Sequence, residues 1–211
     1  MSLVRSSYLE TARQAANLVA DETVAAQWDE PGALDGMSVG ATAAHLVSSG
    51  IGMVRACIDA DEPPGTRALA PDRFFAGVST DPDAEVHQGV RTNSGEQSSM
   101  GPAALAAQAS ALVDDLERCL PLERPDRRVQ AVFGLDMHLD GFLVTRLVEL
   151  VVHMDDLAAG AGVPLPPISD DAGELVVGCL TGVARRRHGD VEVMRALTRK
   201  ERAQPGVLEI F

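Results

Sequence analysis

The architecture of this 211-residue chain follows from its most apolar segment, which reads Phe142-Leu143-Val144-Thr145-Arg146-Leu147-Val148-Glu149-Leu150-Val151-Val152-His153-Met154-Asp155-Asp156. A helix built from these residues is apolar on almost every side, which is typical of a helix buried inside a bundle. We predict a helix from about Asp136 to Ala159, ended by Gly160 and Gly162 ahead of Pro164.

The polar residues of this segment share one face of the predicted helix. At about 100° per residue, Arg146, Glu149, His153 and Asp156 fall in a single narrow stripe. In one interpretation the stripe faces solvent, and Arg146 with Glu149 is a surface pair worth only ~0.3 kcal/mol. In the other it points into the bundle, where Glu149 and His153, one turn apart, reach the same metal ion. This helix alone favours the first interpretation, because a glutamate four residues before a histidine is a common coincidence.

A second histidine supports the metal interpretation. We predict a helix from Ser38, a suitable N-cap, to about residue 59, and His45 lies beside its apolar face. A lone histidine there is more often a core residue than a ligand, yet it could meet the 136–159 helix across the bundle. Two imidazoles and one carboxylate suit an ion such as zinc, and three protein ligands leave a position open for a thiol or water.

Further helices complete an all-α fold. The spacing of apolar residues predicts helices over 3–27, 71–78 and 102–120, and another from Ser169 or Asp170 to His188. The rest of 61–100 is rich in proline and glycine, so it either hides short helices or covers a functional site, and we expect both. We expect a four-helix bundle with an additional C-terminal helix and a short tail. We divide it into a metal-binding domain over 1–165 and a helical extension over 166–211 packed on the bundle.

The composition narrows the range of partners and compartments. Eighteen Lys and Arg against thirty-one Asp and Glu give a net charge of -13, which disfavours nucleic acid as a partner. The start of the chain lacks the apolar core of a signal peptide, and no uninterrupted apolar run approaches the ~18 residues of a membrane helix. The three cysteines are far apart and suggest no disulfide or thiolate site. We expect a cytoplasmic protein, a monomer or homodimer, with no membrane partner.

Two motifs resemble the mycothiol-dependent maleylpyruvate isomerase family, which is similar in turn to the DinB-like metal-binding bundles. The first is Trp28 followed by Leu34-Asp35-Gly36-Met37-Ser38-Val39 and Ala44-His45-Leu46. The second is Arg146-Leu147-Val148-Glu149-Leu150-Val151-Val152-His153-Met154-Asp155-Asp156-Leu157. The similarity extends to the tail from Arg195 to Arg202, whereas the segment 61–100 matches no part of the pattern.

The resemblance implies a metal ion held by His45, Glu149 and His153. It further implies that the ion is zinc in the first instance, with nickel or cobalt as alternatives, and that it binds the sulfur of mycothiol, which adds to a small electrophilic substrate. Asp156 also matches the motif and could orient His153.

Two arginines are further candidates for the site. Arg146 could balance Glu149 or contact a substrate carboxylate, and Arg91 could bind an anionic thiol or substrate. We therefore take Arg146 and Asp156 as candidate catalytic residues and Arg91 as a candidate cofactor-binding residue.

The expected reaction is thiol transfer or isomerisation. Residues 166–211 are fewer than the further C-terminal domain of the isomerase itself needs, so we expect a less specialised thiol transferase. A metal hydrolase with the same ligands, or a non-catalytic stress-response bundle, are the alternatives.

Overall fold

The structure is a computed structural model, and it describes residues 1–65, 68–79, 81, 84–131 and 134–210. The elements follow one another as α1 (Leu3–Val19), α2 (Glu22–Ala26), α3 (Val39–His45), the π-helical η1 (Leu46–Gly52), α4 (Met53–Asp59), α5 (Pro71–Ala76), α6 (Glu85–Ser98), α7 (Pro102–Cys119), the 3-10 turn η2 (Leu120–Leu122), β1 (Arg128–Ala131), β2 (Leu135–His138), α8 (Leu139–Ala161), α9 (Asp170–His188), α10 (Asp190–Thr198) and the 3-10 turn η4 (Lys200–Arg202).

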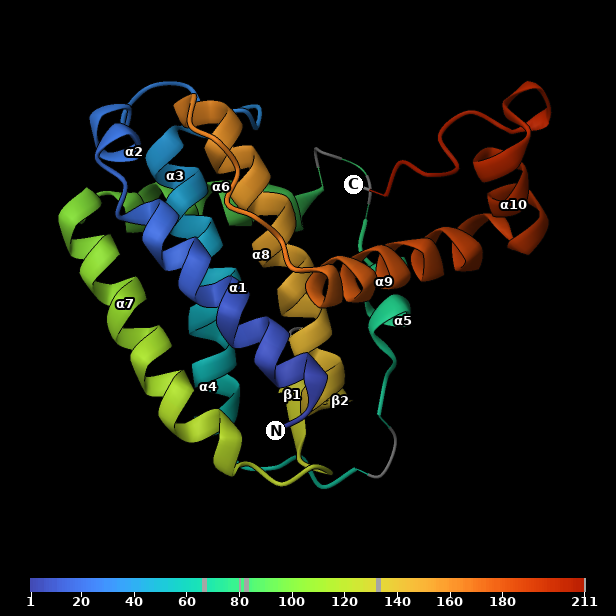
Figure 1. The fold of residues 1–211 in the computed structure, drawn as a ribbon, viewed down its shortest axis with the longest axis horizontal. Helices are drawn as coiled ribbons and strands as arrows, with labels where there is room; N and C mark the ends of the chain where they lie inside the picture. The colour runs from blue at the N-terminus through green and yellow to red at the C-terminus, as the bar shows by residue number, and fades with distance from the viewer. Residues whose placement is uncertain (66–67, 80, 82–83, 132–133, 211) are drawn as a thin grey trace.

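Four long helical rods form the body of the molecule, which confirms the predicted all-α class (Figure 1). They are α1, the continuous rod α3–η1–α4, α7 and α8; α1 packs between α7 and α8, and the continuous rod packs against both of them. The core between them consists mainly of Ala, Val and Leu side chains. The strands β1 and β2 pair antiparallel, from Arg128 opposite His138 to Ala131 opposite Leu135.

Two elements differ from the sequence prediction, and a third is a helix of the kind expected within 61–100. The expected helix over 3–27 breaks after Val19, because the Asp21 carboxylate accepts a hydrogen bond from the Thr23 amide at 2.7 Å and begins α2. The expected start of α8 is displaced to Leu139, because residues 135–138 pair with β1 instead. The segment 85–98 forms α6, which packs on α3 although only Ser94 of its side chains is buried.

The rod that carries His45 contains a π-helical turn, η1, immediately after that residue. Gly50 in this turn allows α8 to come close: a Cβ built on Gly50 would lie 2.5 Å from the Leu150 Cδ2 atom. The side chain of Leu150 is fully buried. The π-helical turn and this glycine therefore bring the rod and α8 into close contact near the predicted ligands.

The rod is also the one described helix that is long and apolar enough to cross a membrane by length and composition. In the structure, 61 % of its most apolar window is buried inside the protein. Such burial fits a core helix of the bundle.

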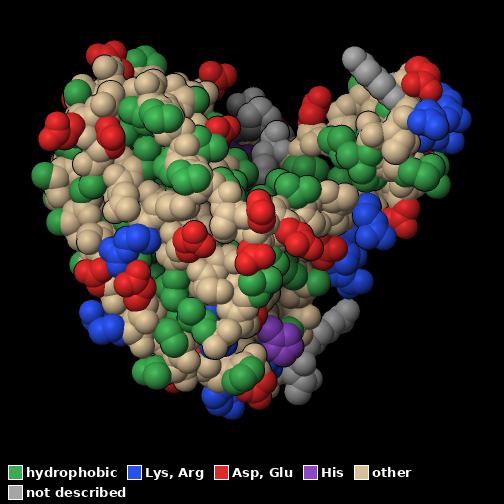
Figure 2. Space-filling view, viewed as in Figure 1, with side chains coloured by type: hydrophobic (Ala, Val, Ile, Leu, Met, Phe, Trp, Pro, Cys, Tyr) green, Lys and Arg blue, Asp and Glu red, His purple; other side chains and the backbone are tan. Residues whose placement is uncertain are grey.

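The C-terminal residues extend away from the four rods. Helix α9 contacts α8, α5 and α1, whereas α10 packs mainly on α9 and projects from the body (Figure 1 and, in space-filling form, Figure 2). The division into domains at residue 165 stays a prediction.

The close packing of Gly40 against Trp28 gives a stability test. A Cβ on Gly40 would lie 2.6 to 2.8 Å from three atoms of the rigid Trp28 indole, whose Nε1 donates to the Ser98 carbonyl. Gly40→Ala is therefore expected to destabilise the protein by about 1–3 kcal/mol in urea unfolding, although alanine normally favours a helix. Gly178→Ala on α9 is the matched control, because its Cβ meets nothing within 4 Å and should stabilise. Equal effects of the two substitutions would contradict this account.

Candidate metal centre

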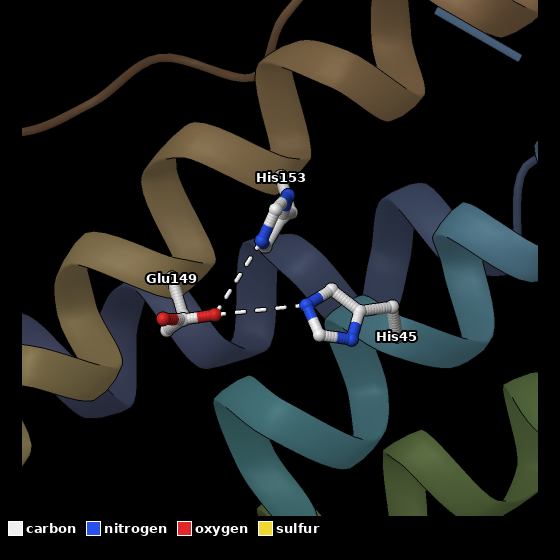
Figure 3. Close-up of side chains that lie close together, drawn as sticks. All are labelled: His45, Glu149 and His153. Atoms are coloured by element: carbon white, nitrogen blue, oxygen red, sulfur yellow. Dashed lines mark ion pairs between the residues drawn. The ribbon is translucent and has the colours of Figure 1, made fainter. Parts of the chain in front are cut away.

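The three predicted ligands meet between two helices. His45 is the last residue of α3, and Glu149 and His153 lie one turn apart on α8. Figure 3 shows the Glu149 carboxylate and both imidazole rings converging from the two helices, with one carboxylate oxygen facing both rings. The polar stripe of α8 therefore faces the rod, as the second of the two sequence interpretations requires.

The distances between the donor atoms fit a single ion. Glu149 Oε2 lies 3.4 Å from His153 Nε2 and 3.7 Å from His45 Nε2, and the three ligand atoms all lie within 4.8 Å of one another. Ligands about 2.1 Å from a tetrahedral ion are roughly 3.4 Å apart, so a contraction of the cluster would bring all three donors within bonding distance of one ion. Within the described residues, this is the group of His, Cys, Asp and Glu side chains whose spacing suits a metal.

The cluster is partly shielded from solvent. The side chains of His45, Glu149 and His153 retain 14 %, 18 % and 17 % of their accessible surface. Three protein donors do not complete a four-coordinate shell, and the residual exposure allows a small molecule to approach. This is the arrangement of a catalytic site more than of a closed structural one.

Asp156 contacts the far side of one ligand. Its Oδ2 lies 2.9 Å from His153 Nδ1, so the carboxylate holds the ring with Nε2 directed at Glu149. Carboxylate partners of this kind fix the tautomer and orientation of metal-binding histidines. The contact is the one that the sequence analysis proposed for Asp156.

Arg146, the other candidate catalytic residue, is buried beneath the cluster, with only 3 % of its surface exposed. The Nη2 atom of Arg146 lies 3.8 Å from Glu149 Oε1, and the guanidinium lies over the rings of Phe74 and Phe142. The pair with Glu149 is therefore a buried one and not the surface pair of the first sequence interpretation. A catalytic role for Arg146 stays a prediction.

The charges of the cluster change the proton affinities of two ligands. Burial raises the pKa of the Glu149 carboxyl, but the neighbouring His153, His45 and Arg146 outweigh burial and hold this pKa well below its usual value. Burial lowers the pKa of His153, but Asp156 and Glu149 outweigh it and raise the pKa to about 9. Without a metal, His153 is therefore protonated at neutral pH, and an ion must displace that proton.

The remaining candidate, Arg91, lies on α6 beside the loop that precedes α3. A Cβ built on Gly36 in that loop would lie 3.4 Å from the Arg91 Cδ atom. The proposed role of Arg91 in binding a thiol stays a prediction.

Sequence reasoning did not find the residues that surround Arg146. Ser49, Met53 and Phe74 come from two separate segments and join it only in the folded protein. The one sequence signal was the Ser-Gly-Ile-Gly run at 49–52, which is an unusual composition for the middle of a buried helix.

The Asp156 contact predicts a measurable effect on metal binding. Asp156→Asn is expected to lower the affinity for Zn²⁺ roughly 10- to 100-fold, because an amide holds the His153 ring more weakly and does not raise its basicity. Competition titration against a chromophoric chelator measures this. Asp155→Asn, an exposed neighbour on the same helix, is the control and should bind as the wild type does. An Asp156→Asn protein with unchanged affinity would show that the contact is incidental.

The fold and the site define this protein as a helical bundle with a candidate metal centre of two histidines and one glutamate between two of its helices. Within this class, residues 8–158 match the family model described as the mycothiol maleylpyruvate isomerase N-terminal domain. The match covers more than half of the chain, and the protein therefore belongs to this family. Comparison with curated proteins gave no significant match, and neither did comparison with solved structures.

Proposed function

We propose that this protein is a metal-dependent transferase or isomerase that uses a mycothiol-type thiol on a small electrophilic molecule. The observation that carries the proposal is the convergence of His45, Glu149 and His153 on one point that remains partly open to solvent. Membership of the mycothiol maleylpyruvate isomerase family supports the thiol as the molecule that fills the open position. We further propose zinc as the ion and the cytoplasm as the compartment.

The chemistry follows from the donor set. A zinc ion held by two neutral imidazoles and one carboxylate would favour the thiolate form of a small thiol at neutral pH. The thiol proton leaves to solvent, the sulfur electron pair forms a carbon–sulfur bond with the electrophile, and a proton from solvent neutralises the adduct. In an isomerase, rotation about the former double bond is followed by loss of the added carbon-bound proton and cleavage of the carbon–sulfur bond, which re-forms the double bond and releases the thiol. In a transferase the adduct is the product.

The surrounding residues support this reaction in different ways. Asp156 keeps His153 Nε2 directed at the site, and the low pKa of Glu149 keeps this ligand ionised at every physiological pH.

The test is the dependence of turnover on thiol and on metal. Protein stripped with a chelator and reloaded with Zn²⁺ is incubated with electrophiles, including maleylpyruvate, and with mycothiol, glutathione or no thiol. Loss of free sulfhydryl and consumption of the electrophile are both followed. We expect turnover that needs the metal and a thiol together, with mycothiol the best of the three.

Other outcomes distinguish the alternatives. Metal-dependent cleavage of activated esters without any thiol would indicate a hydrolase that uses a bound water. Metal binding without turnover of any substrate would favour a non-catalytic bundle. Glu149→Gln is the control, because it keeps the size of the side chain and removes the charge of the carboxylate ligand.

A further inference from the structure

The buried Arg146 contacts both of the helices that carry the ligands. From α8, its Nη1 donates to the Ser49 carbonyl in η1 at 3.2 Å and approaches the Met53 sulfur at 3.5 Å. On its own helix, Nε donates to Thr145 Oγ1 at 3.1 Å, and Nη2 lies 3.8 Å from Glu149 Oε1. A single planar guanidinium therefore joins the π-helical turn after His45 to the carboxylate ligand of α8.

The π-helical turn needs such partners. Where a π-helical turn interrupts an α-helix, main-chain carbonyls lose the regular spacing of their helical hydrogen bonds. Two consecutive carbonyls of η1 receive side-chain donors from other helices: Ser49 from Arg146, and Gly50 from the Tyr8 hydroxyl at 2.8 Å. Because η1 begins directly after His45, the position of this turn sets where the His45 ring lies.

The same arginine divides the two oxygens of the glutamate. Oε1 of Glu149 faces Arg146, whereas Oε2 faces both histidine rings. Glu149 therefore directs one oxygen, Oε2, toward the centre of the cluster.

We propose that Arg146 is a positioning residue that fixes the geometry of the metal centre by joining the π-helical turn of His45 to Glu149. The proposal rests on the proposed metal function. It assigns Arg146 no contact with substrate, in agreement with the burial of its side chain and the packing of its guanidinium over the Phe74 and Phe142 rings.

The direction in which metal affinity changes on replacing Arg146 distinguishes a positioning role from simple charge balance. If Arg146 acted only as a positive charge near the site, removing that charge would strengthen the binding of a cation. If Arg146 holds the ligands in place, removing it lets the π-helical turn and Glu149 move, and binding weakens. A loss of metal affinity in Arg146→Met would therefore show that Arg146 holds the metal ligands in position.

The experiment compares the wild type with variants of Arg146 and Tyr8, each loaded with Co²⁺, whose visible absorption spectrum depends on coordination geometry. We expect Arg146→Met to bind Co²⁺ at least about tenfold more weakly than the wild type and to show an altered spectrum. Arg146→Lys keeps the charge but lacks the fork that reaches two partners at once, so its affinity should lie between the other two. Tyr8→Phe removes the second contact to η1 and should change the spectrum in the same direction, by less.

A second buried arginine is the control for unfolding. Arg5 is 4 % exposed and donates to the carbonyls of Leu120, Glu123 and Arg124. Its ion-pair partner Asp140 lies more than two helical turns before Glu149 on α8. Arg5→Met should lower the melting temperature of the metal-free protein as Arg146→Met does, with the Co²⁺ spectrum of the folded protein unchanged.

The outcomes are distinct. Wild-type protein that binds no Co²⁺ would overturn the metal function and this inference together. Wild-type protein that binds Co²⁺, with folded Arg146→Met that binds it equally or more tightly and with the same spectrum, would overturn the inference alone. If Arg146→Met fails to fold, Arg146→Lys and Tyr8→Phe decide: wild-type affinities and spectra in both would overturn the positioning role.

Discussion

His153→Ala is expected to lower the affinity of the protein for Zn²⁺ by roughly a thousandfold. The binding free energy of protein zinc sites is on the order of 10–16 kcal/mol, so each of three or four ligands contributes about 4 kcal/mol. Loss of His153 should have a large effect, because Asp156 contacts its Nδ1 atom and orients the ring, and its Nε2 atom lies 3.4 Å from Glu149 Oε2. Alanine leaves two donors from separate helices, and two donors hold the ion weakly.

Competition titration with a chromophoric chelator gives the affinity, and circular dichroism checks that the variant is folded. His188→Ala is the matched control, because His188 is an exposed histidine at the end of α9. Its affinity should equal that of the wild type. A His153→Ala protein that binds Zn²⁺ within tenfold of the wild type would place the ion elsewhere or show that His153 is not a ligand.

The second large effect is a rise in metal affinity with pH. The pKa of His153 is raised to about 9 in the metal-free protein, so the ring carries a proton that the metal must displace. Displacing one proton changes the apparent affinity about tenfold per pH unit below that pKa, or roughly a hundredfold between pH 6 and pH 8. Titrations at several pH values measure the slope. A flat profile over this range would mean that His153 is neutral before the metal binds.

The metal-free protein should show the opposite trend in stability. The folded pKa of His153, about 9, lies above the ordinary value of 6.5. Protonated His153 therefore contributes stability that is fully present below pH 6.5 and is lost as the pH rises through 9. Glu149 stays ionised over this range, because its pKa is held well below the usual value. Urea unfolding at pH 6.5, 8 and 9.5 tests the trend, and His153→Ala should remove this contribution.

The expected pH dependences of metal affinity and of stability have the same physical basis, which is the charge between His153, Glu149 and Asp156. Without metal, protonated His153 pairs with Glu149 and Asp156 and keeps the cluster assembled. In the proposed function, a metal ion would replace the proton as the positive charge between the same side chains. The site is therefore pre-organised in the absence of metal, which limits the rearrangement that loading requires.

The sequence by itself determined the main helices and the identity of the candidate ligands. The apolar run over 142–156 indicates a buried helix because burial on all sides needs apolar residues on all sides. Ser38 marks the start of the His45 rod because its hydroxyl accepts the Ala41 amide hydrogen bond. The spacing of Glu149 and His153 placed both on one face, since four residues make about one helical turn.

Only the tertiary structure determined where that face points and what lies against it. Helical periodicity defines a face but not its neighbour, so a solvent-exposed stripe and an inward-facing one have the same sequence pattern. The π-helical turn, the hairpin before α8 and the contacts of Arg146 with Ser49 and Glu149 depend on residues distant in the chain. Their physical origin is packing between helices and the need to satisfy buried polar groups, and neither is encoded in local spacing.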